Sequence, residues 1–191
     1  MSDFLPYVRD GIALRRLRTS DLRSFQHYRC DPAVGQFQGW SASTDIEAEG
    51  FLEVMSQTPL FASDDWTQLA IADAATDVLI GDIGVHIEKD ASAAEIGFTL
   101  APAAQGKGIA SRAVRMTLDL LFQHTAVMRV LATTDARNER SIRLLEGVGM
   151  RRVESREAMF RGEPCTEHTY LIERPLNATA TPRRAEHNHR G

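Results

Sequence analysis

The feature that most constrains this chain is a glycine-containing turn, Gln105-Gly106-Lys107-Gly108-Ile109-Ala110. The residues before it, 95–100 (EIGFTL), are typical of a short strand, and residues 111–123 have the apolar spacing of an amphipathic helix. Such a turn directs several backbone N–H groups at one point, at the positive end of the helix dipole. Glycine keeps that point free of side chains, so a bulky anion can approach the backbone. The sequence therefore predicts a phosphate-binding turn.

Two common nucleotide-binding patterns do not fit this turn. No GxxxxGK[ST] pattern can be placed on it, which excludes a Walker motif. A dinucleotide-binding fingerprint also fails, because Ser111 stands where the third glycine would be needed. A short pair of glycines is by itself also typical of a loop that only caps a helix, so the interpretation depends on the rest of the chain.

The surrounding sequence predicts an α/β fold with one mixed sheet. Apolar alternation and turn residues predict strands at 12–18, 66–72, 78–88, 95–100 and 127–133 and two more within 151–173. Helices are expected at 19–30, 44–55, 111–123 and 138–147, the second introduced by the capping-box spacing of Thr44 and Glu47. Strand 127–133 follows a crossover helix, so it should lie parallel to strand 95–100, while antiparallel pairs make up the rest.

Length and composition limit the classes of protein that this chain can be. Its 191 residues, 43% apolar and 25% charged, fit a single globular domain over residues 1–176. Residues 177–191 lack periodicity and are expected to form a disordered tail. A net charge of −4 argues against a nucleic-acid-binding protein. Two cysteines, no apolar leader and no membrane-spanning window predict a cytoplasmic protein that does not enter a membrane.

Four strings, in this order and spacing, carry a resemblance to a known family. They are IGDIG at 80–84, EIGFTL at 95–100, QGKGIASRAVR at 105–115 and ARNERSIRLLEGVGM at 136–150. Over residues 10–175 the chain resembles the GCN5-related N-acetyltransferases (GNAT), and most of all the branch of ribosomal-protein N-terminal acetyltransferases (RimJ/RimL type). The resemblance implies a mostly antiparallel central sheet flanked by helices, with one parallel strand pair splayed at an acetyl-CoA site.

The resemblance also implies how acetyl-CoA, the cosubstrate, would be held without a metal. The backbone N–H groups of Gln105, Gly106, Lys107, Gly108, Ile109 and Ala110 would hold the pyrophosphate. The main chain of Phe98, Thr99 and Leu100 would pair with the pantetheine arm as an added strand does. Asn138 would bond the arm from the opposite side, and Ser141 would lie near the thioester sulfur. Asn138 is equally suited to be a helix N-cap after strand 127–133.

The reaction implied is direct attack of a primary amine on the thioester, which requires a base. Glu95 is the first candidate and His86, on the neighbouring strand, is the second, although a solvated glutamate and a structural histidine would look the same. Many family members carry a tyrosine that protonates the leaving thiolate, where this chain has Leu145. Ser141, water or no group at all would then serve as the acid.

The acceptor remains open between a protein N-terminus, a small amine and an amino-acid-like metabolite. An α-amine with a pKa of about 7.7–8.0 is easier to deprotonate at neutral pH than a lysine-type amine, by roughly 3–4 kcal/mol. Candidate walls of the acceptor site are Phe37, Trp40 and Phe61, and the final hairpin supplies Arg156, Glu163, Glu167 and His168. Exposed strand edges would allow a homodimer. The alternative to an enzyme is a non-catalytic acyl-CoA-binding sensor or partner-binding module with the same fold.

Overall fold

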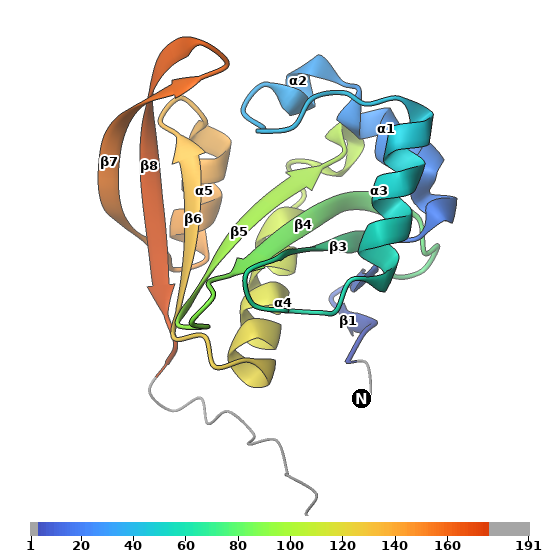
Figure 1. The fold of residues 1–191 in the computed structure, drawn as a ribbon, viewed down its shortest axis with the longest axis horizontal. Helices are drawn as coiled ribbons and strands as arrows, with labels where there is room; N and C mark the ends of the chain where they lie inside the picture. Colours follow the sequence, from blue (N-terminus) through green and yellow to red (C-terminus); the bar gives the residue numbers. More distant parts are fainter. Residues whose placement is uncertain (1–3, 176–191) are drawn as a thin grey trace, which may run out of the picture.

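The computed structural model describes residues 4–175, which form one eight-stranded sheet in the order β1-β2-β3-β4-β5-β6-β8-β7 (Figure 1). The strands are β1 (Tyr7–Arg9), β2 (Ile12–Arg16), β3 (Trp66–Asp73), β4 (Leu79–Ile87), β5 (Ala93–Leu100), β6 (Arg129–Asp135), β7 (Arg151–Phe160) and β8 (Glu163–Glu173). The α-helices are α1 (Leu22–Arg29), α2 (Pro32–Gly35), α3 (Asp45–Gln57), α4 (Ile109–His124) and α5 (Glu139–Gly147). Short 3₁₀ turns occupy Thr19–Asp21 and Pro102–Ala104.

The predicted class is confirmed, including a single parallel pair, β5 with β6, among antiparallel neighbours. Two short elements were not predicted. β1 has three residues and α2 has four, which is too few for a periodic pattern. The Asp31-Pro32 pair does end α1, as expected, but it also begins α2, because the Asp31 carboxylate accepts from the Ala33 N–H at 2.8 Å. The predicted tail, 177–191, lies outside the described residues.

The starts of α1 and α3 show how far capping patterns predict structure. Thr44 caps α3 as expected, with its N–H donating to Glu47 Oε2 at 2.8 Å and its Oγ1 accepting from the Glu47 N–H. The helix predicted from residue 19 begins only at Leu22, after the 3₁₀ turn. Asp21 makes no capping bond to α1, because its carboxylate is buried against the Arg15 guanidinium at 2.8 and 2.9 Å. A tertiary ion pair therefore replaced the expected cap.

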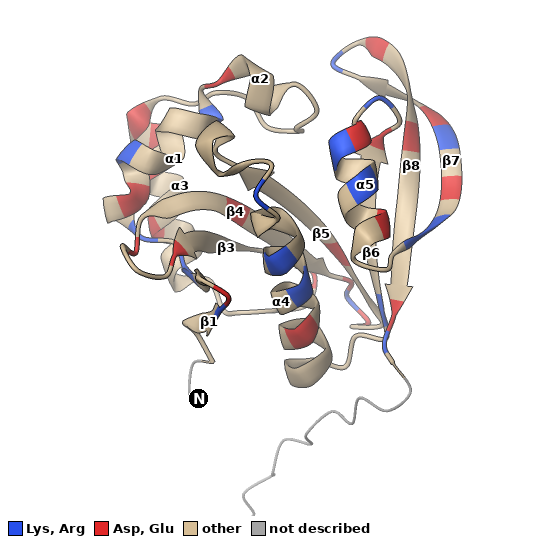
Figure 2. Cartoon of the chain, turned by 180° about the vertical axis from the view of Figure 1, so that it is seen from behind, with Lys and Arg blue, Asp and Glu red and all other residues tan. Residues whose placement is uncertain are grey.

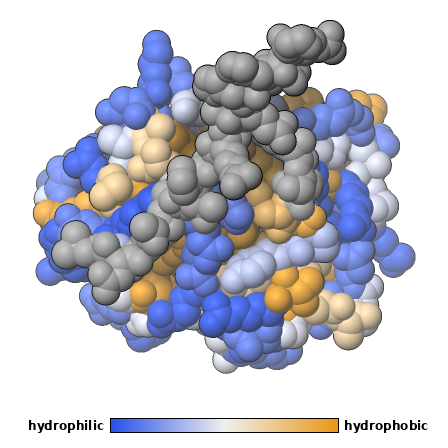
Figure 3. All heavy atoms as spheres, turned by 90° about the horizontal axis from the view of Figure 1, so that it is seen from below, coloured by the Kyte–Doolittle hydropathy of each residue, from blue (hydrophilic) through white to orange (hydrophobic). Residues whose placement is uncertain are grey.

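Helices cover both faces of the sheet and create two apolar clusters. α4 and α5 lie on one face, where Ile83, Ile96 and Leu121 belong to the larger cluster. α1 and α3 lie on the other, where Phe25 and Leu52 belong to the smaller one (Figure 1). Within residues 4–175, no helix combines the length and apolarity needed to cross a bilayer. The face seen from below carries hydrophobic residues in separate areas among hydrophilic ones (Figure 3).

The sheet opens between β5 and β6. These strands pair over only three positions, from Ala93 opposite Arg129 to Glu95 opposite Leu131. Beyond that point β5 continues to Leu100 against β4, and β6 continues to Asp135 against β8, while the two strands diverge (Figure 1). Two strand edges in the middle of the sheet are thus left without a ladder between them. This gap places the predicted site residues at the carboxyl ends of a parallel pair, where ligands bind in open α/β sheets.

Candidate active site

The glycine turn forms an open concave surface at the start of α4. Gly108 is the N-cap of α4 with φ +70°, and Gly106 has φ +74°. A Cβ placed on Gly106 would meet no atom within 4 Å, and one on Gly108 would meet only a guanidinium nitrogen of Arg112, at 3.9 Å. Both residues therefore adopt a backbone conformation that favours glycine, and the space in front of them is free.

The backbone donors of this turn are available for an anion. The Gln105 N–H is used within the protein, donating to the Pro102 carbonyl at 3.1 Å. The first bond of the helix is donated by the Arg112 N–H to the Gly108 carbonyl at 3.2 Å. Within residues 4–175, the N–H groups between them, at positions 106–111, donate to no protein acceptor. The cradle therefore begins one residue later than predicted, and its geometry suits phosphate oxygens.

Arg112 adds a cation to this cradle that sequence reasoning missed. It lies one helical turn after Gly108, on the side of α4 that faces the turn. Its Nε is buried and, among the described residues, is one of two buried side-chain nitrogens without a hydrogen-bond partner. An unpaired buried guanidinium nitrogen beside free backbone donors fits a negatively charged ligand. The four-residue spacing from Gly108 was visible in the sequence. Figure 2 shows basic segments on both α4 and α5.

The Gln105 side chain is a brace between three elements. Its Nε2 donates to the Leu100 carbonyl at 3.0 Å, and its Oε1 accepts from Arg140 at 2.9 Å. Gln105 thus joins the end of β5 to the turn and to α5. With its N–H and both side-chain polar atoms engaged in the protein, Gln105 shapes the cradle.

Main-chain groups on β5 point alternately to β4 and into the gap. The Ala101 N–H donates to the Ile80 carbonyl at 2.9 Å, so odd-numbered residues of β5 face β4. Of the three residues predicted to pair with pantetheine, Thr99 therefore faces β4, and Phe98 and Leu100 face the gap. Main-chain pairing with pantetheine, which the resemblance implies, can therefore involve Phe98 and Leu100 but not Thr99.

Both carbonyls on this open edge already accept hydrogen bonds. Gln38 Nε2 donates to the Phe98 carbonyl at 3.3 Å, and Gln105 occupies that of Leu100. The N–H groups of Phe98 and Leu100 point the same way and face no strand. The edge therefore presents donors to the gap, which suits the carbonyl oxygens of an extended ligand.

Asn138 and Ser141 lie at the start of α5, across the gap from β5. Asn138 is the N-cap, as one of the two interpretations predicted, with Oδ1 accepting from the Ser141 N–H at 3.2 Å. Its Nδ2 is not used in this bond, so capping leaves a donor for a ligand. Leu145 is fully buried in the larger cluster. Its position therefore supplies packing and no proton.

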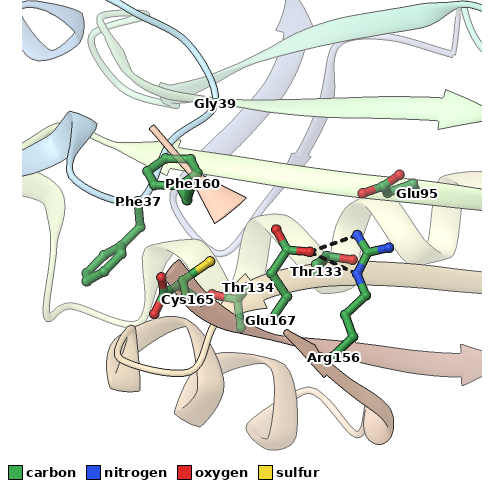
Figure 4. A pocket seen from close by; sticks show the side chains of 10 residues that line it. Phe37, Gly39, Glu95, Thr133, Thr134, Arg156, Phe160, Cys165 and Glu167 are labelled. Carbon is green, nitrogen blue, oxygen red and sulfur yellow. Dashed lines mark hydrogen bonds and ion pairs between the residues drawn. The ribbon is translucent and has the colours of Figure 1, made fainter. Parts of the chain in front are cut away.

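A cavity of about 420 Å³ opens on the other side of the same gap (Figure 4). It lies between the end of β6, the β7–β8 hairpin and the loop after α2, and Glu95 stands at its edge where the β5–β6 ladder ends. The residues lining it are Phe37, Gly39, Glu95, Thr133, Thr134, Asp135, Arg156, Phe160, Cys165 and Glu167. Two aromatic rings and several polar groups around a space of this size are typical of a small-molecule site.

Two ion pairs neutralise most of the charge on the cavity wall. Arg156 donates through Nε and an Nη to one oxygen of Glu167, at 3.1 and 2.8 Å, which raises the Arg156 pKa (Figure 4). Arg137 holds both oxygens of Asp135, at 2.9 and 2.6 Å, and this pairing lowers the Asp135 pKa. Glu95 is exposed and forms no ion pair or hydrogen bond with its side chain among the described residues. Among the described residues that line the cavity, Glu95 is thus the carboxylate without a direct ion pair, although it lies within the electrostatic influence of Arg156.

Not all predicted wall residues reach the cavity. Phe37 lines it, but Trp40 lies against the Arg29 guanidinium, 4.4 Å from the ring centroid. His86 is the cross-strand neighbour of Glu95 and packs on Trp66, with centroids 5.4 Å apart. Phe61 stacks on Phe4 instead.

In the hairpin, Arg156 and Glu167 line the cavity, whereas Glu163 and His168 do not. His168 bonds to Ser155. The lining residues at the end of β6, Thr133, Thr134 and Asp135, were not predicted, although the carboxyl end of a parallel strand could have indicated them.

The sheet opens at one parallel strand pair, with an anion cradle on one side of the gap and an acceptor-sized cavity on the other. This combination is that of an N-acetyltransferase. The model of the acetyltransferase (GNAT) domain matches residues 12–151, so the chain belongs to this family. It is therefore an acetyl-CoA-dependent N-acetyltransferase, as the resemblance implied.

Three known proteins illustrate the similarity. "Uncharacterized N-acetyltransferase p20" of Bacillus licheniformis is 27% identical over 145 residues, covering 75% of this chain and 80% of that protein. Spermidine N-acetyltransferase from Vibrio cholerae, solved with CoA and spermine, superposes with a TM-score of 0.75 at 19% identity, covering 87% and 97% of the two chains. RimL, the ribosomal L7/L12 α-N-protein acetyltransferase in complex with CoA, gives 0.75 at 15% identity over 88% and 97%.

Proposed function

We propose that this protein transfers the acetyl group of acetyl-CoA to a primary amine by direct attack within a ternary complex. Acetyl-CoA supplies the activated thioester carbonyl. The amine would enter through the cavity beside Glu95 and meet the thioester in the gap between β5 and β6. The observation that supports this most is the six-residue run of free backbone N–H groups at 106–111, with the unpaired Arg112 Nε beside it.

The residues of the cradle would hold the cosubstrate. The N–H groups from Gly106 onward and the Arg112 guanidinium would bind the diphosphate, and the helix dipole of α4 would add to that attraction. The Phe98 N–H would bind a pantetheine carbonyl, which leaves the Leu100 N–H for the reacting carbonyl, and the Asn138 amide would donate from α5. The resulting orientation turns a bimolecular reaction into an effectively unimolecular one.

Glu95 would receive the proton of the attacking amine, directly or through one water. Among the described residues it is the cavity carboxylate whose oxygens make no ion pair or hydrogen bond, so they remain accessible to an entering amine. A gap-facing N–H such as that of Leu100 would stabilise the negative charge that develops on the carbonyl oxygen. Ser141 would donate a proton to the departing thiolate. That demand is modest, because a thiol with a pKa of about 8.5 leaves readily.

The test compares Glu95→Gln with Glu173→Gln, an exposed glutamate at the far end of β8. Thiol release from acetyl-CoA would be followed with a panel of primary amines, and acetyl-CoA affinity would be measured separately. We expect kcat to fall about 10²-fold or more in Glu95→Gln with little change in acetyl-CoA affinity, and no loss in Glu173→Gln. Equal loss in both variants, or none in Glu95→Gln, would remove Glu95 from the role of base.

Leu145 supplies no hydroxyl to protonate the leaving thiolate, which leaves a non-catalytic function as the alternative. A sensor that binds acyl-CoA without turnover would use the same cradle and would need no acid. Tight acetyl-CoA binding together with no thiol release for any amine in the panel would favour the sensor over the enzyme.

A further inference from the structure

The loop between α2 and α3 crosses above the cavity, and residues 36–40 are here called the roof loop. Phe37 and Gly39 of this loop line the cavity, together with Phe160 from the tip of the β7–β8 hairpin. The hairpin tip bends toward α2 across the gap (Figure 1). Segments about 120 residues apart in the chain therefore meet over the acceptor cavity.

Arg161 fastens the hairpin tip to the roof loop. It occupies the two-residue hairpin turn with Gly162, at φ +53° and +82°, which projects its side chain from the tip. One guanidinium nitrogen donates to the Gln38 carbonyl at 3.2 Å and to the Trp40 carbonyl at 2.8 Å. The same guanidinium lies 5.4 Å from the Phe160 ring centroid. Arg161 therefore joins the hairpin tip to the roof loop beside the cavity and covers one face of the Phe160 ring.

The roof loop is also anchored on the β5 side of the gap. Gln38 Nε2 donates to the Phe98 carbonyl at 3.3 Å. The Trp40 ring packs on Arg29, whose guanidinium pairs at 2.9 Å with Asp82, a residue that is 1% exposed. On the β6 side, Arg137 lies 5.9 Å from the Phe37 ring centroid. The loop is thus held on both sides of the gap, with Arg161 as its contact to the hairpin tip.

The space under this loop has the size of a small-molecule site. A volume of about 420 Å³ lies within the range of roughly 300–1,000 Å³ that is usual for small-molecule sites. Phe37 and Phe160 form apolar walls, and Glu95 supplies a free carboxylate at the end near the gap (Figure 4). An acceptor that fits these features has a compact apolar body and one amine directed at Glu95.

We propose that the acceptor is a small primary amine of this kind, not the N-terminus of a protein, and that Arg161 sets the size limit. The inference rests on the proposed function and specifies its substrate. An extended peptide adds about 3.3 Å per residue, so a protein N-terminus would need room for the following chain beside the contact between Arg161 and the roof loop. A small amine needs no such room once it is bound.

The test uses acceptors of rising size on the full-length protein: alkylamines, arylalkylamines, amino-acid amides, and peptides of about two to eight residues with free N-termini. For the wild type we expect kcat/KM to fall at least about tenfold from the best small amine to the longest peptide. Arg161→Ala should flatten this decline while leaving the KM for acetyl-CoA unchanged. Arg151→Ala, which removes an exposed arginine at the far end of β7, should keep the wild-type profile.

Phe160→Ala is a second variant that enlarges the cavity without touching the roof-loop carbonyls, and it should favour bulkier small amines over the smallest. Equal kcat/KM along the peptide series in the wild type would overturn the size limit and leave the proposed function intact. An Arg161→Ala profile identical to that of Arg151→Ala would overturn the role of Arg161. No thiol release with any acceptor would overturn the proposed function, and this inference with it.

Discussion

Replacing Gly108 by alanine separates the cost of backbone strain from the cost of blocking the phosphate cradle. At φ +70°, a Cβ costs about 1–2 kcal/mol of stability, because L-residues disfavour the left-handed region. No protein atom opposes the new methyl, since only Arg112 comes as near as 3.9 Å. The methyl would instead stand where phosphate oxygens approach. We expect acetyl-CoA affinity to fall at least tenfold, about 1.4 kcal/mol.

Gly11 provides a matched control in the turn between β1 and β2. Its φ is +79° and a Cβ there would meet nothing within 4 Å, so Gly11→Ala carries the same backbone cost far from the cradle. The assay is the free energy of unfolding with and without acetyl-CoA at 100 times the wild-type Kd. The wild type and Gly11→Ala should each gain about 2.7 kcal/mol, and Gly108→Ala about 1.4 kcal/mol. If Gly108→Ala gains as much as Gly11→Ala, the cradle does not bind the diphosphate.

Two further predictions concern the buried carboxylate of Asp82, which accepts hydrogen bonds from Tyr28, Arg29 and Gln68. Asp82→Asn should lower the free energy of unfolding, measured with denaturant, by about 3–5 kcal/mol, because it leaves Arg29 unpaired. Asp119→Asn, at an exposed ion pair, should lower it by under about 1 kcal/mol. Similar losses of stability in the two variants would contradict the argument. Burial and the charge of Asp82 raise the pKa of Tyr28 well above its usual value. The stability from this shift is fully present below pH ~10, the usual pKa of a tyrosine, and is lost as pH rises from there toward the raised pKa of Tyr28. The wild type should therefore weaken more than Tyr28→Phe between about pH 10 and 11.5, and parallel declines would refute it.

Elements whose signals are local were predictable from the sequence. The helix after the glycine turn has a long apolar stripe, and α3 carries its own capping box, so neither depended on distant contacts. The parallel direction of β6 followed from the crossover helix before it. The start of α1 was not predictable, because Asp21 is drawn away from its cap by Arg15, a partner on β2 that only the folded chain brings near.

The candidate site divides in the same way. The cradle residues from Gly106 to Ala110 are contiguous, so the turn chemistry could be inferred from one string. The cavity wall is assembled by strand register, which places Asp135 opposite Glu167 and brings Phe160 over the gap from the hairpin tip. No local pattern encodes such a meeting, and for this reason Trp40 and Phe61 were predicted as wall residues while Phe160 was not.

Because β5 and β6 pair at only three positions, the sheet consists of two halves joined by one short parallel ladder. One half contains β1–β5 and the other contains β6–β8, and beyond Glu95 no β5–β6 ladder pairing joins the two halves. An extended ligand bound between β5 and β6 would form hydrogen bonds with both halves of the sheet, where the two strands do not bond to each other. Ligand binding would then also make the sheet more rigid, and slower amide hydrogen exchange along the facing edges of β5 and β6 would show it.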